Sequence, residues 1–104
     1  MCRWIAYSGS PIALSHLVTE PEASLIDQSL SARLSEHVTN GDGFGIGWYR
    51  PQGHGRRGGP GVHRSARPAW NHENLYDLAL HIDSPLVLAH VRASTSGAVQ
   101  RSNC

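Results

Sequence analysis

The sequence predicts an α+β fold, because strand patterns and helical patterns are mixed along it. Residues 43–49 alternate glycine with large apolar side chains, which is the period of a strand. Residues 72–82 carry apolar side chains at helical spacing, and residues 86–91 form a nearly continuous apolar run. The 104 residues are enough for one small, marginally stable domain. They predict too few strands for a complete two-sheet domain.

The first 40 residues predict a strand, a turn and a helix. Residues 3–7 mix Trp, Ile and Tyr and predict a strand, and the Ser-Gly-Ser-Pro sequence that follows predicts a turn. Residues 22–38 place five apolar side chains at roughly helical spacing, although serines dilute the pattern.

The glycine-rich strand has two different faces. Three glycines share one face and three large apolar side chains share the other. Because glycine weakens a strand, three on one face indicate close approach of another backbone or of a ligand. The sequence Asn-Gly-Asp-Gly at 40–43 predicts a turn before the strand. The glycines are Gly43, Gly45 and Gly47, and the apolar residues are Phe44, Ile46 and Trp48.

A loop and a second strand are predicted next. Residues 50–61 are rich in glycine and arginine and most simply join two antiparallel strands, the second near residues 62–65. Asn71 is expected to cap the helix at 72–82, with Ser84-Pro85 ending that helix.

The end of the chain predicts a buried strand and then a loop. The run at 86–91 is expected to be buried on both faces of a sheet, because it is apolar at almost every position. Residues 93–104 are mostly small and polar, which is typical of a loop.

Charge and cysteine content exclude several classes of protein. The formal charge of +1 is too small to indicate nucleic acid or a membrane surface as a partner. Cys2 and Cys104 do not make a disulfide framework, and the N-terminus lacks a secretory signal. No apolar run approaches the ~20 residues that span a bilayer. We therefore expect a cytoplasmic protein, in which thiols stay reduced.

Cys2 is the first candidate for chemistry. Removal of Met1 would leave a thiol and a free α-amine on one residue. An α-amine titrates near ~7.7–8, so part of it can act as a base toward the adjacent thiol at neutral pH. The alternative is a small buried cysteine of the core, which position alone favours.

Arg92 is the second candidate. An arginine directly after a buried strand is costly unless it is paired or faces a cleft, and its planar guanidinium suits a carboxylate. Residues 94–97 add hydroxyl and backbone donors. The alternative is a surface arginine where the strand emerges, and the two interpretations are equally good from this residue alone.

Two other patterns favour simpler interpretations. Five histidines recur every nine residues, but their flanks do not repeat and no pair has the spacing of a zinc site, so no metal is expected. The Arg/Gly-rich residues 50–61 resemble an RNA-contacting segment, but a solvated hairpin loop fits better because no aromatic residue lies within them. The histidines are His54, His63, His72, His81 and His90.

Four motifs in order resemble the class II glutamine amidotransferase family. They are Met-Cys-Arg at 1–3, Asn-Gly-Asp-Gly-Phe-Gly at 40–45, Ala-His-Val-Arg-Ala-Ser-Thr-Ser-Gly at 89–97 and Ser-Asn-Cys at 102–104. The order and spacing are most similar to the subgroup that acts on γ-glutamyl compounds. The resemblance covers nearly the whole chain.

The resemblance implies roles for three residues. Cys2 would be the nucleophile, Arg92 would bind the α-carboxylate of glutamine or a γ-glutamyl compound, and Thr95 would help to hold the amino-acid end of that substrate. No metal or organic cofactor is implied. A synthase that receives ammonia, or a second copy of the chain, is an expected partner. The alternative from another class is a non-catalytic binding module that contacts RNA through residues 50–61.

The family also implies a larger domain than these residues provide. Its fold is a four-layer αββα sandwich, of which residues 1–104 would form the N-terminal portion. In the family a His-Pro-Phe sequence, an Asn-Gly that supplies the oxyanion hole and an Asp that binds the substrate amine come after the position of Cys104. We therefore expect the 104 residues alone to be inactive, because loss of one oxyanion donor can lower a rate by ~10²–10³.

Overall fold

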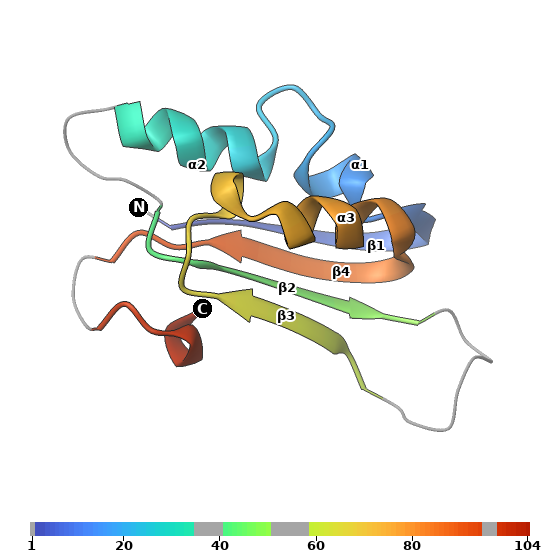
Figure 1. Cartoon of the computed structure of the whole chain (residues 1–104). Helices are drawn as coiled ribbons and strands as arrows, with labels where there is room; N and C mark the ends of the chain where they lie inside the picture. The colour runs from blue at the N-terminus through green and yellow to red at the C-terminus, as the bar shows by residue number, and fades with distance from the viewer. Residues whose placement is uncertain (1, 35–40, 51–58, 95–97) are drawn as a thin grey trace.

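One antiparallel sheet with helices on one face makes up the described part of the chain (Figure 1). The computed structural model describes residues 2–34, 41–50, 59–94 and 98–104. The strand order is β1-β4-β2-β3, and every neighbouring pair is antiparallel. This confirms the predicted α+β class. The strands are β1 (Arg3–Ala13), β2 (Phe44–Tyr49), β3 (Gly61–Ser65) and β4 (Asp83–Val91).

Strand β1 is longer than predicted, so the turn expected after residue 7 is wrong. The strand continues to Ala13, and its pairing with β4 shifts register between Ser8 and Ile12. The Ser-Gly-Ser-Pro sequence is therefore accommodated as an irregularity inside an edge strand. Pro11 is tolerated there because an edge strand does not need every backbone N–H for pairing.

The first two helices follow β1. Helix α1 (Ser15–Val18) was not predicted, because four residues are too few to show a helical period. Helix α2 (Leu25–Leu34) begins later than the predicted residue 22. The Ser24 hydroxyl accepts a hydrogen bond from the Asp27 amide at 3.1 Å, which caps the helix at this point. Residues 35–38 of the predicted helix lie outside the described residues.

Helix α3 (Glu73–His81) agrees with the predicted helix, but its two ends do not. Asn71 lies in the preceding 3-10 turn η1 (Ala69–Asn71) and does not cap α3, because His72 occupies the capping position. The helix ends at His81, before Ser84-Pro85, and both of these residues belong to β4. Backbone extension at Ile82, where ψ is 120°, starts the strand directly.

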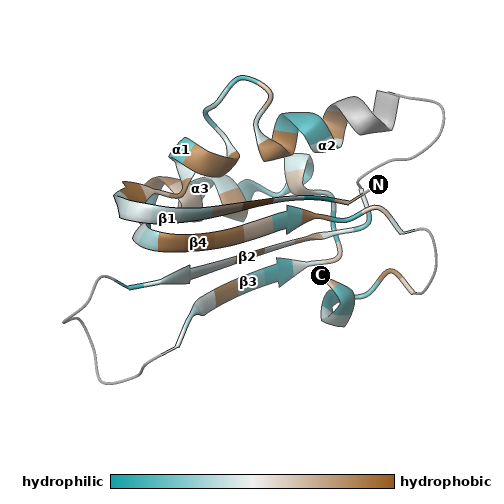
Figure 2. Cartoon of the chain, turned by 180° about the vertical axis from the view of Figure 1, so that it is seen from behind, coloured by the Kyte–Doolittle hydropathy of each residue, from teal (hydrophilic) through white to brown (hydrophobic). Residues whose placement is uncertain are grey.

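The prediction that residues 86–91 are buried on both faces is wrong. Val87, Ala89 and Val91 are buried against the helices, whereas Leu86 and Leu88 are 44% and 63% exposed on the opposite face. The apolar character of β4 is visible along much of its length (Figure 2). A helical layer covers only one face of the sheet in the described part of the chain. These residues therefore provide two layers of the four that the resemblance implied.

The hydrophobic core lies between the helices and the sheet. Phe44 and Ile46 from β2 contribute to it, as predicted from the strand pattern, and Trp48 packs against it while partly buried. Leu75 and Ala79 of α3 are buried, as the helical spacing predicted. The remaining buried members are Leu14, Val18, Leu25, Ile26, Ala69, Val87, Ala89 and Val91.

Candidate active site

The ladder between β1 and β4 positions Cys2. Arg3 pairs with Val91, and extending the same register by one residue places Cys2 opposite Arg92. The Cys2 Sγ atom accepts a hydrogen bond from the Ala93 amide at 3.4 Å and lies 3.5 Å from the Ala93 carbonyl oxygen. The thiol is a free cysteine and is exposed. It therefore lies at the accessible end of the strand pair and not in the core.

Arg92 follows the last residue of β4 and is only 9% exposed. Its Nη1 atom donates to the Ala98 carbonyl oxygen at 3.0 Å, and its Nη2 atom donates to the Ser94 hydroxyl at 3.4 Å. A guanidinium has five N–H donors, so these two bonds engage part of its capacity. Arg92 is buried and hydrogen-bonded, which contradicts the alternative of a surface arginine.

The segment before β2 lies beside Arg92. The Arg92 amide donates to the Gly43 carbonyl oxygen at 2.8 Å, and the Asp42 amide donates to the Arg92 carbonyl oxygen at 3.1 Å. The Asp42 carboxylate accepts from the Ser94 amide at 2.6 Å. The backbone after β4 is thereby held on one side by Cys2 and on the other by residues 42–43.

Two of the three glycines on this face, Gly43 and Gly45, are closely approached as the sequence predicted, whereas a Cβ atom on Gly47 would meet nothing nearer than 3.7 Å. A Cβ atom on Gly43 would collide with the Cys104 Sγ atom, and one on Gly45 would lie 3.1 Å from the Cys104 carbonyl carbon and 3.2 Å from the His90 Nε2 atom. The short 3-10 turn η2 (Arg101–Asn103), which lies in the region predicted as a loop, precedes Cys104. Glycine is therefore required here by another segment of the same chain.

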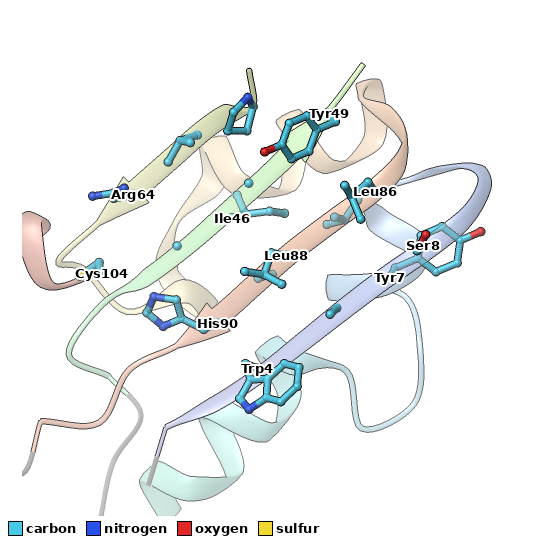
Figure 3. Close-up of a pocket in the computed structure, with 17 residues that line it drawn as sticks. Trp4, Tyr7, Ser8, Ile46, Tyr49, Arg64, Leu86, Leu88, His90 and Cys104 are labelled. Atoms are coloured by element: carbon cyan, nitrogen blue, oxygen red, sulfur yellow. The ribbon is translucent and has the colours of Figure 1, made fainter. Parts of the chain in front are cut away.

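A groove of about 650 Å³ extends from this end along the face of the sheet that the helices leave open. Figure 3 shows Leu86, Leu88 and His90 of β4 facing it. His90 pairs with Gly45, which in turn pairs with Arg64, so the imidazole and the guanidinium flank a bare glycine. Burial lowers the pKa of His90, and Arg64 and Arg92 lower it further. Both effects favour the neutral form of the imidazole.

The structure brings together two of the three residues predicted for the site. Cys2 and Arg92 are neighbours at the end of one ladder, whereas Thr95 lies outside the described residues. Ser94 was predicted only as one of several donors at 94–97, and Asp42 was not singled out at all. Asp42 belongs to a sequence that predicted only a turn, and the Ser94 amide that it binds is 52 residues away. The only local feature that could have drawn attention to Asp42 was the Asp-Gly sequence directly before the strand at 44–49.

The arrangement combines a thiol with a guanidinium, the two groups that the sequence predicted as nucleophile and carboxylate site. A thiol that carries its own α-amine can be activated without a second side chain, provided that the amine is free. A nearby guanidinium can bind a carboxylate through two parallel hydrogen bonds. No group of three or more His, Cys, Asp or Glu side chains in the described residues is placed to hold a metal ion. In the same ranges no helix is both long and apolar enough to cross a membrane.

Comparison with known proteins gives the family. The chain is 44% identical to a Saccharomyces cerevisiae protein named "Probable glutamine amidotransferase DUG3", over 100% of the chain and 30% of that protein. It is 37% identical to the γ-glutamyl-hercynylcysteine sulfoxide hydrolase of Mycolicibacterium smegmatis, over 93% of the chain and 41% of that enzyme. The chain belongs to the class II glutamine amidotransferase family. No family model matches it.

A solved structure supports the same assignment. A class-II glutamine aminotransferase domain protein from Silicibacter pomeroyi superimposes with a TM-score of 0.54 at 30% identity, covering 90% of this chain and 32% of that one. The chain therefore spans about a third of the length of the relatives that it matches. The fold agrees with part of an N-terminal-nucleophile hydrolase domain.

Proposed function

We propose that the chain supplies the nucleophile and the carboxylate-binding arginine of a glutamine amidotransferase or γ-glutamyl amide hydrolase. The observation that carries the proposal is the contact of the Cys2 thiol with Ala93, the residue next to Arg92, just beyond the Arg3–Val91 pair of the β1–β4 ladder. The Cys2 thiol contacts the backbone of Ala93, so it lies next to the residue that follows Arg92 in the chain. The names of the relatives support the general class of reaction.

The reaction would proceed through a covalent intermediate. The Cys2 sulfur attacks the γ-amide carbon of the substrate, and its proton passes to the α-amine directly or through one water. The C–N bond then breaks, and ammonia or an amine leaves with that proton. Water adds to the resulting γ-glutamyl thioester, which releases glutamate and restores the thiol. Ammonia could pass to a synthase partner or be released to solvent.

Arg92 would orient the substrate for this attack. Its guanidinium donates hydrogen bonds to the Ala98 carbonyl oxygen and the Ser94 hydroxyl. Its remaining N–H groups can pair with the α-carboxylate of a glutamyl group. Binding of the carboxylate fixes the glutamyl chain at one end, so that the γ-amide carbon is brought to a fixed nucleophile. Thr95 would assist at the same end of the substrate.

Release of glutamate from two substrates tests the proposal. The protein that carries the chain, with Cys2 as its first residue, is incubated with glutamine and with a γ-glutamyl dipeptide. We expect glutamate from at least one substrate, and we expect Cys2→Ala to abolish it. Cys104→Ala is the matched control, because it removes the other thiol and should leave the reaction in place. Equal glutamate release by Cys2→Ala and the unaltered protein would contradict the proposed mechanism.

A further inference from the structure

We propose that Asp42 is a positioning residue that holds Arg92 in its substrate-binding orientation through Ser94. The inference rests on the proposed function of Arg92. It concerns a residue that the substrate would not touch. Its basis is a set of three hydrogen bonds that join Asp42, Ser94 and Arg92 at both the main chain and the side chains.

The shortest of these bonds comes from the carboxylate. The Asp42 Oδ2 atom accepts from the Ser94 amide at 2.6 Å. A hydrogen bond to an ionised acceptor is roughly twice as strong as a neutral one, so this contact fixes the backbone at Ser94. The Ser94 hydroxyl in turn accepts from the Arg92 Nη2 atom at 3.4 Å. Asp42 therefore acts on the guanidinium through one intermediate residue.

A second link acts on the main chain. The Asp42 amide donates to the Arg92 carbonyl oxygen at 3.1 Å. Asp42 thus holds both the backbone of Arg92 and the residue that contacts its side chain. Both links cross from the segment before β2 to the end of β4, directly before residues 94–97, which were expected to add donors for the substrate.

The Asp42 carboxylate does not form an ion pair with Arg92, and both residues belong to the described part of the chain. The described residues contain one ion pair, between His16 and Glu20. A direct Asp–Arg pair would compete with the carboxylate of a substrate for the same guanidinium donors. Because Asp42 binds a backbone amide instead, it can orient Arg92 and leave the guanidinium charge available.

Two substitutions at one position separate this role from a merely structural one. Asp42→Ala removes the acceptor, whereas Asp42→Asn keeps a carbonyl oxygen that can accept the Ser94 amide. We expect Asp42→Ala to raise KM for the glutamyl substrate about tenfold and to change kcat less than about threefold. Asp42→Asn should restore KM to within about threefold of the unaltered protein. Asp77→Ala on the exposed surface of α3 is the control and should leave KM unchanged.

Hydrogen exchange at the Ser94 amide gives a readout that does not depend on activity. We expect exchange about tenfold faster in Asp42→Ala than in Asp42→Asn, because only the alanine variant lacks an acceptor. If the unaltered protein releases no glutamate, the proposed function fails, while this measurement still decides whether Asp42 orders the segment. Equal exchange rates in all variants would overturn the inference.

A last variant keeps the inference testable if Asp42→Ala does not fold. Ser94→Ala keeps the hydrogen bond from the backbone amide of residue 94 to the Asp42 carboxylate. It removes the hydroxyl that contacts Arg92. We expect a rise in KM of about threefold with unchanged kcat. A KM equal to that of the unaltered protein in Ser94→Ala, or in a folded Asp42→Ala, would overturn the link between Asp42 and the guanidinium.

Discussion

The Cys2 Sγ atom lies 3.4 Å from the amide nitrogen of Ala93, the residue that follows Arg92. The candidate nucleophile and the candidate carboxylate site are therefore coupled through a single strand pair. Sites carried by regular elements are held more tightly than sites carried by loops. Any change that shifts β1 along β4 is expected to alter the distance between the thiol and the guanidinium.

The mature N-terminus should be Cys2. The α-amine can serve as a base only when it is free, so Met1 must be removed before the thiol can be activated by its own residue. Intact-mass measurement of the protein isolated from cells should show loss of one methionine. A protein that retains Met1 and still releases glutamate at the full rate would exclude the α-amine mechanism.

Arg92→Lys should weaken substrate binding. Lysine keeps the charge but cannot form two parallel hydrogen bonds with a carboxylate, so the expected loss in kcat/KM corresponds to ~1.5–3 kcal/mol. Arg64→Lys is the control, because Arg64 is an exposed residue on the same face of the sheet. Unchanged kcat/KM in Arg92→Lys would leave the residue with a structural role.

The sequence predicted those elements whose period of apolar residues is visible within a short stretch of chain. The alternation at 43–49 predicted β2, because the same glycines and apolar residues determine both the strand and its two faces. The helical spacing of Leu75 and Ala79 predicted the buried face of α3. The sequence also predicted that another group lies close to the glycines. It did not predict that this group is Cys104, because Cys104 is distant from Gly43 in sequence.

Features that depend on distant partners were not predictable. Leu88 is apolar and was expected to be buried, but its exposure depends on which layer covers that face of the sheet. Asp42 was interpreted as part of a turn, because a carboxylate that binds an amide 52 residues away leaves no local pattern. The extension of β1 through Pro11 also required knowledge of its partner strand, since the sequence alone favours a turn.

Gly43→Ala should destabilise the fold by roughly 2–4 kcal/mol. Gly43 has a φ of 123°, which strains any other residue, and an added Cβ would collide with the Cys104 Sγ atom and lie 2.6 Å from the Ser65 carbonyl oxygen. Gly59→Ala is the matched control, because its φ is 139° but nothing lies within 4 Å of the added carbon. Chemical unfolding should show the larger loss at position 43, and equal losses would mean that crowding at Cys104 contributes nothing.

Stability should fall as the pH drops below about 6.5, the ordinary pKa of histidine. Burial lowers the pKa of His63, and His72 and Arg101 lower it further. The unfolded chain therefore binds the proton more tightly than the folded chain, so acidification favours unfolding. The ring centroids of His63 and His72 are 5.2 Å apart. The Nε2 atom of His63 and the Nδ1 atom of His72 are both buried without a hydrogen-bond partner in the described residues.

Matched glutamine substitutions test the source of this pH dependence. His63→Gln removes a half-buried histidine, whereas His81→Gln changes an exposed histidine at the end of α3. Thermal midpoints measured between pH 7.5 and 5.5 should decline less steeply in His63→Gln than in the unaltered protein, and His81→Gln should follow the unaltered protein. His90 has a lowered pKa as well, so part of the slope should remain in His63→Gln. Identical slopes for both variants would show that His63 does not contribute.

The isolated 104 residues should associate at micromolar concentration and release no ammonia from glutamine. The open face of the sheet exposes apolar side chains that include Leu86 and Leu88, at 44% and 63% exposure, and such a face favours contact with another copy. Leu88→Gln should weaken association in sedimentation velocity. Leu80→Gln should not, because Leu80 is similarly exposed, at 59%, on a helix away from that face. A sharply melting monomer that releases ammonia through Cys2 would show that these residues suffice for the complete site.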